Sequence, residues 1–171
     1  MKIAISKLEK QLSLKLKRNH SSIGLDTATV TGICIAKTDS KNIVLEFITY
    51  DLRKIKDRLD RYDHMIDQFI NIITPDLKTV VIEESFLGRN VKTFQLLSRI
   101  SAYAYEAAHN HAKIKDIRFY TPTSARKRIG LNTYKAKKED IHKEFMAKTG
   151  LQLTNKDEID AFVLSLCGLI K

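Results

Sequence analysis

The feature that most constrains the fold is a buried strand that ends in a carboxylate. Residues 22–25 are small or apolar, as in a central strand of a sheet, and Asp26 follows them directly. Small polar residues then form a turn, and residues 33–35 resume the sheet. An isolated buried carboxylate is very costly, so Asp26 must be paired, hydrogen-bonded or bound to a cation. Taken alone, the stretch also fits an aspartate that caps a turn.

A second apolar strand ends in the same way. Residues 79–82 form a continuous apolar run that leads into Glu83 and Glu84. Side chains alternate between the two faces of a strand, so we expect only one of these glutamates to approach Asp26. Phe86 follows in a loop, where its ring either stacks on a nucleic-acid base or packs under the loop.

The last predicted helix begins with two further carboxylates. Asp157 and Asp160 are three residues apart and therefore share one face of that helix. Acidic residues at a helix N-terminus are also stabilised by the helix dipole, which is the structural alternative. The face of Asp160 continues through Val163 and Leu164, which are core-type residues. An aspartate at the head of an inward-facing stripe needs a partner.

Four carboxylates brought together would repel one another, and at least one would be protonated without a counter-charge. Divalent cations resolve this repulsion, and oxygen ligands alone suit Mg²⁺ or Mn²⁺. Two such ions a few ångströms apart stabilise the attacking and leaving oxygens of a phosphodiester displacement. The pattern therefore favours a metal-dependent nuclease.

The overall charge points to the same class of partner. The 171 residues suffice for one domain, and the formal net charge is +10 with a pI near 9.6. A strong basic excess favours nucleic acid, although solubility or a ribosomal or membrane-surface role would also fit. Cys34 and Cys167 lie in apolar runs and are expected to be reduced core residues. No run is long and apolar enough to cross a bilayer, and the N-terminus lacks a secretory signal, so we expect no membrane partner.

Residues 1–20 form a basic segment ahead of the first core strand. Ile5, Leu8, Leu12 and Leu16 fall near helical spacing, which predicts a short amphipathic helix or arm that could contact a nucleic-acid backbone. A loosely packed, solvated extension fits equally well. An organellar transit peptide is a third alternative.

The rest of the chain alternates strands and helices. Hydrophobic periodicity predicts strands at 43–50 and 117–120 and helices at 53–73, 90–112, 124–131, up to Thr149 and from Asn155 to the C-terminus. Thr121 and Pro122 fit a helix start, and Gly150 fits a helix end. Two clusters of basic residues suit phosphate contacts or a solvated face: Arg126, Lys127, Arg128, Lys135, Lys137 and Lys138.

Taken in order, these elements resemble the RNase H-like superfamily, and within it the RuvC-like Holliday junction resolvases. The resemblance runs from residue 23 to 169 on the motifs GLDT (24–27), IEESF (82–86), AKKEDI (136–141) and DEIDA (157–161). It implies an α/β fold, a mixed five-stranded sheet flanked by helices. The nuclease domain would then comprise residues 21–171, after the basic extension 1–20.

The resemblance also implies roles for individual residues. The metal-binding catalytic carboxylates would be Asp26, Glu83, Asp157 and Asp160, with Lys138 at the scissile phosphate and Phe86 stacking at the junction. Glu84 stands where the family usually has an amide, so which glutamate ligates stays open. Either Arg126 or Lys127 would match a further DNA-contacting lysine. The full expected DNA-binding set is Phe86, Arg89, Arg126, Lys127, Arg128, Lys135, Lys137 and Lys138.

As an activity, the resemblance implies a Mg²⁺-dependent endodeoxyribonuclease that acts as a homodimer on four-way DNA junctions and cuts them by symmetric paired nicks. Two Mg²⁺ per active site are expected, and Mn²⁺ could substitute. Helix 90–112 is the expected dimer seam. Two alternatives stay open: a nuclease with broader specificity for branched DNA or another RNase H-like activity, and a non-catalytic nucleic-acid-binding module. We expect a cytoplasmic location in a bacterium or a phage-infected host, with an organelle as the alternative. The preferred cleavage sequence and any branch-migration helicase partner do not follow from the sequence.

Overall fold

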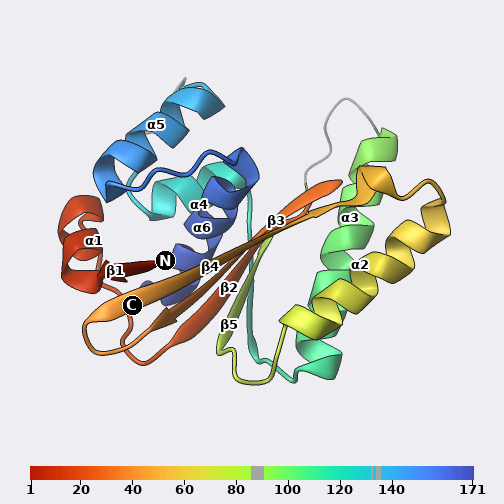
Figure 1. Ribbon diagram of the computed structural model, residues 1–171, viewed down its shortest axis with the longest axis horizontal. Coiled ribbons are helices and arrows are strands. Elements are labelled where there is room, and N and C mark those ends of the chain that lie inside the picture. The colour runs from red at the N-terminus through yellow and green to blue at the C-terminus, as the bar shows by residue number, and fades with distance from the viewer. Residues whose placement is uncertain (86–90, 132, 134–135) are drawn as a thin grey trace.

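A six-stranded mixed sheet with helices on both faces forms the body of the molecule in the computed structural model, which describes residues 1–85, 91–131, 133 and 136–171 (Figure 1). The strand order is β1-β4-β3-β2-β5-β6. Strand β2 pairs antiparallel with β3 and parallel with β5, which itself pairs parallel with β6. The strands are β1 (Lys2–Ala4), β2 (Ser21–Asp26), β3 (Val30–Thr38), β4 (Asn42–Asp51), β5 (Thr79–Glu83) and β6 (Asp116–Tyr120).

The expected mixed α/β sheet is thus confirmed, but the expected count of five strands is wrong. The sixth strand, β1, comes from the N-terminal segment and pairs antiparallel with the edge of β4, Lys2 opposite Val44. Strand β1 has only three residues, and its partner β4 lies some forty positions away. Such a short segment has too little hydrophobic pattern to be predicted as a strand from sequence.

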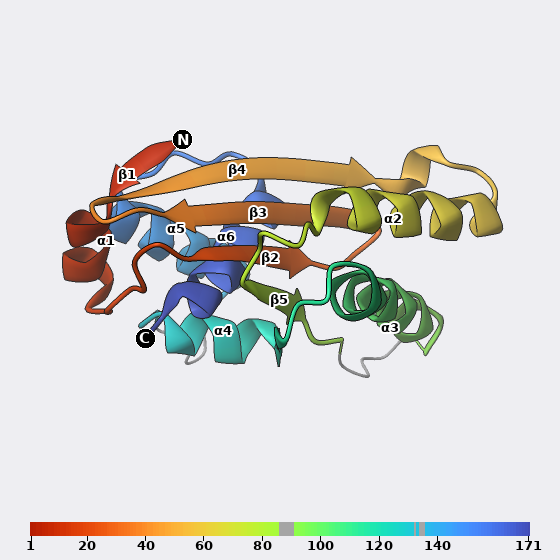
Figure 2. The ribbon, with the colours of Figure 1, turned by 90° about the horizontal axis from the view of Figure 1, so that it is seen from below.

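The helices divide between the two faces of the sheet. Helices α2 (Arg58–Ile72) and α3 (Val91–Glu106) cover one face (Figures 1 and 2). The other face carries α1 (Ile5–Leu12), α4 (Pro122–Arg128), α5 (Lys138–Thr149) and α6 (Lys156–Leu169). Helix α2 begins later than expected because the Asp57 side chain accepts hydrogen bonds from two backbone amides of the first turn. After α3, a π-helical turn at Ala107–His111 completes the expected helix to residue 112.

Local signals set the ends of the helices near the candidate site. The Thr121 side chain accepts a hydrogen bond from the Ser124 amide, and Pro122 takes the first helical position of α4, as expected. Gly150 ends α5 with a φ of 68°, a left-handed conformation that glycine adopts without strain. Asn155 caps α6 through a hydrogen bond from the Asp157 amide. These short connections determine where α5 and α6 begin relative to the sheet.

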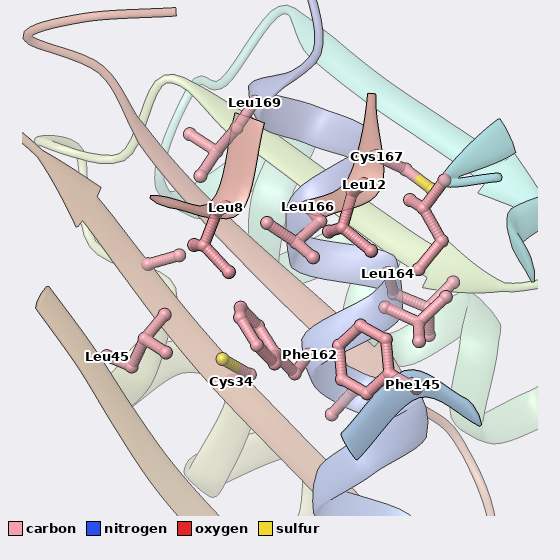
Figure 3. Close-up of a cluster of buried hydrophobic side chains, with 14 of the residues drawn as sticks. Leu8, Leu12, Cys34, Leu45, Phe145, Phe162, Leu164, Leu166, Cys167 and Leu169 are labelled. Atoms are coloured by element: carbon pink, nitrogen blue, oxygen red, sulfur yellow. The ribbon is translucent and has the colours of Figure 1, made fainter. Parts of the chain in front are cut away.

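Helix α6 is the centre of the core on its face of the sheet. From Ile159 to Leu169 every residue of α6 is buried, and Phe162 packs against Phe145 (Figure 3). Phe162 also packs against Phe47 of β4. The helix lies very close to β2 because Gly24 has no side chain. A Cβ atom at Gly24 would overlap the Ala161 carbonyl oxygen and the Ser165 amide nitrogen. The contact places the first turns of α6 beside the end of β2.

Residues 1–20 are part of this core. Ile5, Leu8 and Leu16 are completely buried, and Leu8 and Leu12 project into the same cluster as residues of α6 (Figure 3). Glu9 accepts a hydrogen bond from the Leu16 amide and pairs with Arg18, Nη2 to Oε2 2.8 Å, which closes the segment back onto α1. The predicted amphipathic helix is confirmed, and the alternative of a loosely packed extension is wrong.

The two cysteines are buried and unbonded to each other, as expected for core residues. Burial raises the pKa of each thiol to about 12, so both stay protonated near neutral pH. Among the described residues, no helix combines the length and the apolarity that a membrane crossing requires.

Candidate active site

Asp26 and Glu83 meet where the two parallel strands β2 and β5 end. Leu25 lies opposite Ile82 in the parallel pairing, so the residues that follow them, Asp26 and Glu83, also lie side by side. Both carboxylates lie on the face of the sheet that α6 covers, and they share a hydrogen bond. Glu84 instead lines a groove on the opposite face with Tyr105 and Phe119. The expectation that only one glutamate approaches Asp26 is confirmed, and that glutamate is Glu83.

Asp160 brings a third carboxylate to the same place from the second turn of α6. It is only 5% exposed, yet both of its oxygens have cationic or hydrogen-bonding partners. Arg126 Nη2 lies 2.8 Å and His142 Nε2 3.0 Å from Oδ1, and Lys138 Nζ lies 2.6 Å from Oδ2. These partners come from α4 and α5, so Asp160 ties three helices together beneath the ends of the strands.

A cleft of about 470 Å³ opens over these groups. Three carboxylates, two basic side chains and the start of α4 line it. Its lining residues are Asp26, Glu83, Thr121, Pro122, Thr123, Arg126, Lys138 and Asp160.

The electrostatics of the cleft favour a bound cation near Asp26 and Glu83. Burial, followed by the charges of Glu83 and Asp160, raises the pKa of Asp26 well above its usual value. Burial also raises the pKa of Glu83, although the hydrogen bond that it accepts from Asp26 acts in the opposite direction. Without a cation, these shifts favour a proton shared between the two carboxyl groups. A divalent cation can replace that proton because it removes the same repulsion.

Asp160 is stabilised as an anion by its three partners. Burial alone would raise its pKa, but the hydrogen bond from His142, the charge of Arg126 and the bond from Lys138 together hold that pKa far below its usual value. Burial would lower the pKa of Lys138, and the contact with Asp160 outweighs it and raises that pKa. Asp160 is thus ionised throughout the range in which the protein would act.

The other predicted site residues fall in three groups. Asp157 does not line the cleft, because it lies one helical turn earlier, where its backbone packs against Gly32 of β3. Lys127 and Lys137 are exposed beside the cleft, and Arg128 lies over the Tyr120 ring at 5.8 Å. Three further predicted DNA-binding residues lie outside the described residues: Phe86, Arg89 and Lys135.

The donor set fits a divalent cation at the Asp26–Glu83 pair, since both supply oxygen ligands in a polar cleft. Within the described part of the chain, no three His, Cys, Asp or Glu side chains are arranged so that they could already hold a metal ion. Both oxygens of Asp160 are already occupied by Arg126, Lys138 and His142. Asp160 would have to exchange at least one of these partners to become a ligand.

Two features of the site were missed by the sequence analysis. His142 is buried against Asp160. Its spacing of four residues from Lys138 places both on one face of α5, and this spacing could have predicted that His142 lies near the site. Hydroxyl groups support Glu83 from the side of α3. Ser101 Oγ donates to the Glu83 carbonyl oxygen at 3.3 Å and lies 2.8 Å from Thr27 Oγ1. Nothing in the sequence distinguishes Ser101 from the other small residues of α3.

Comparison with known proteins adds sequence and fold similarity to this geometry. No protein-family model matches the chain. The crossover junction endodeoxyribonuclease RuvC of Alkaliphilus oremlandii (strain OhILAs) is 34% identical over 115 residues, 65% of this chain. The aligned region spans 66% of that relative, just under two thirds of its length.

Three solved structures share the fold. Thermus thermophilus RuvC aligns over 86% of this chain and 92% of its own, with a TM-score of 0.68 at 16% identity. The T. thermophilus RuvC complex with a Holliday junction substrate aligns over 86% of this chain and 91% of its own, with a TM-score of 0.66 at 14% identity. The yeast mitochondrial Holliday junction resolvase aligns over 94% of this chain and 82% of its own, with a TM-score of 0.54 at 12% identity. The expected RNase H-like fold is thereby confirmed.

Proposed function

Because the chain is RuvC-like in both sequence and fold, we propose that it is a structure-selective endonuclease that resolves four-way DNA junctions by symmetric paired nicks. One observation carries the proposal. Carboxylates from β2, β5 and α6 meet in a single cleft with Arg126 and Lys138 at its wall. The carboxylates suit divalent cations, and the basic side chains suit the phosphate that is to be cut.

We assign cation binding to Asp26, Glu83 and Asp160, with Mg²⁺ as the ion and Mn²⁺ as a substitute. Two ions per site are proposed, and Asp157 is the proposed fourth carboxylate at the outer end of α6. Bound in this cleft, such ions would activate a water molecule and neutralise charge that develops on the phosphate. A cation held by Asp26 and Glu83 would displace a proton shared between them, because it would remove the repulsion between the two carboxylates.

Lys138 and Arg126 have a second task in this proposal. Both contact Asp160 in the DNA-free protein, and Lys138 is the more accessible of the two, with 43% of its side chain exposed against 11%. A phosphate that enters the cleft competes with Asp160 for Lys138, which then holds the non-bridging oxygens in place. The proposed contacts along the DNA backbone are Lys127, Arg128, Lys137 and, outside the described residues, Arg89 and Lys135. Phe86, which also lies outside the described residues, is proposed to stack at the junction.

We further propose a homodimer with α3 at its interface. A four-way junction has two-fold symmetry, and cutting its two strands of like polarity requires two active sites, one from each protomer. Val91, Tyr105 and Phe119 are large apolar side chains exposed on or beside α3. Tyr105 and Phe119 line a groove of about 420 Å³ that a second copy would cover. The bacterial source of the relative supports a cytoplasmic location as part of the same proposal.

Substitutions at the paired carboxylates test the proposed function. Asp26→Asn and Glu83→Gln should abolish junction cleavage in Mg²⁺ while gel-shift binding of the junction persists. Glu46→Gln is the control, because it makes the same chemical change at an exposed position of β4 that lines neither the cleft nor the groove beside α3. Loss of binding together with unfolding in the first two variants, or equal loss of cleavage in the control, would contradict the proposal.

A further inference from the structure

His142 is a buried polar residue next to the cleft that the sequence motifs do not include. Its side chain is 5% exposed, and the residue projects from the second turn of α5. Its buried neighbours along α5, Ile141 and Phe145, are apolar. Nε2 lies 3.0 Å from Asp160 Oδ1, so this nitrogen carries the proton that the carboxylate accepts.

The other ring nitrogen is left without a partner. Nδ1 is fully buried and has no hydrogen-bond partner among the described residues. A buried polar atom without a partner costs stability, and an apolar side chain at this position would avoid the cost. Among the described residues, the polar contact that the His142 ring makes is therefore the one between Nε2 and Asp160.

The partners of Asp160 differ in how easily they can leave. Lys138 is on a flexible side chain that is nearly half exposed, and it holds Oδ2. His142 is enclosed, and it shares Oδ1 with Arg126. When a phosphate or a cation displaces Lys138, Oδ2 is released, whereas the bond from His142 to Oδ1 persists.

We propose that His142 is a positioning residue that locks Oδ1 of Asp160, so that Oδ2 is the oxygen presented to a divalent cation. The inference rests on the proposed function, in which Asp160 is a metal ligand. Hydrogen bonds to a ligand from residues behind it fix its orientation and typically contribute 10- to 100-fold to metal affinity. His142 acts through Asp160 and does not touch the cation or the DNA.

The test compares two amides of different length. In His142→Gln the side-chain nitrogen can reach the place of Nε2, whereas in His142→Asn it reaches only the place of Nδ1. We expect His142→Asn to weaken Mn²⁺ binding by about 10- to 100-fold in titration calorimetry on the DNA-free protein. His142→Gln should restore most of that affinity. His142→Leu fills a similar volume without a hydrogen-bond donor and should bind Mn²⁺ as weakly as His142→Asn. If His142→Asn does not fold, His142→Leu takes its place in the comparison.

Two results would overturn the positioning role: wild-type affinity in both the donor and the non-donor variants, or equal loss in both. Melting temperatures of the variants show whether a loss of Mn²⁺ affinity comes from misfolding. A loss from misfolding would affect His142→Gln and His142→Leu alike. Asp160→Asn is measured alongside. If the wild-type protein does not bind Mn²⁺, or Asp160→Asn binds it as tightly as wild type, the result refutes the proposed metal site. It would not by itself refute the positioning role of His142.

Discussion

The close approach of α6 to β2 determines where Asp160 lies, and Gly24→Ala tests this dependence. The added methyl group would overlap two backbone atoms of α6, the Ala161 carbonyl oxygen and the Ser165 amide nitrogen. Backbone atoms cannot rotate away as a side chain can, so α6 would have to retreat from the sheet by about 1 Å. Asp160 would then move away from Asp26 and Glu83.

Two effects compete in this variant. Overpacking a well-filled core costs about 1–3 kcal/mol, and a clash with backbone belongs at the upper end. Replacing glycine restores about 0.4–1 kcal/mol by stiffening the unfolded chain. We therefore expect a net loss of about 2 kcal/mol in the free energy of unfolding, measured by urea denaturation. Because a displacement of 1 Å at a catalytic group costs about 100-fold in rate, junction cleavage should fall by that factor.

Leu8→Ala is the control for destabilisation alone. Leu8 is completely buried in the same cluster but comes from α1, away from the cleft, and its truncation should cost about 2–5 kcal/mol. At a temperature where both variants are folded, this control should cleave at nearly the wild-type rate. Wild-type stability and cleavage in Gly24→Ala, or an equal loss of cleavage in both variants, would refute the reasoning.

Two further predictions concern the paired carboxylates. In EDTA, Asp26→Asn should increase the free energy of unfolding at alkaline pH, because the raised pKa of Asp26 means that ionisation in the folded state costs stability. That gain should vanish as the pH falls below the usual range of an aspartate, where wild-type Asp26 is protonated in both states, and pH-dependent urea denaturation measures it. Binding of Mn²⁺ should release the proton held by Asp26 and Glu83, so affinity should decrease as the pH falls. Calorimetry in two buffers with different ionisation enthalpies counts that proton, and a count of zero contradicts the assignment.

Strand periodicity was enough to predict the centre of the site. A buried apolar run that ends in a carboxylate has few structural explanations, and two such runs in parallel strands bring Asp26 and Glu83 to one edge of the sheet. The alternation of side chains also predicted that Glu83 and Glu84 face opposite sides, but only the structure identifies Glu83 as the one beside Asp26. Asp160 was predictable for a similar reason, because it heads an inward-facing stripe of α6.

The parts that sequence did not provide depend on packing between distant elements. Asp157 shares a helix face with Asp160, but three residues advance a helix by about 4.5 Å, which takes Asp157 out of the cleft and beside Gly32. The contact of His142 with Asp160 depends on the angle between α5 and α6, which no local pattern encodes. Burial of residues 1–20 depends on β1 finding the edge of β4.

Cleavage of an end-labelled four-way junction, compared with a matched duplex in Mg²⁺ and in EDTA, tests the central claim most directly. The account predicts paired, metal-dependent nicks placed symmetrically across the junction, with the duplex left intact. Equal cleavage of flaps and forks would indicate a broader nuclease for branched DNA. Binding of the junction without cleavage in either Mg²⁺ or Mn²⁺ would contradict the account and leave a non-catalytic DNA-binding module.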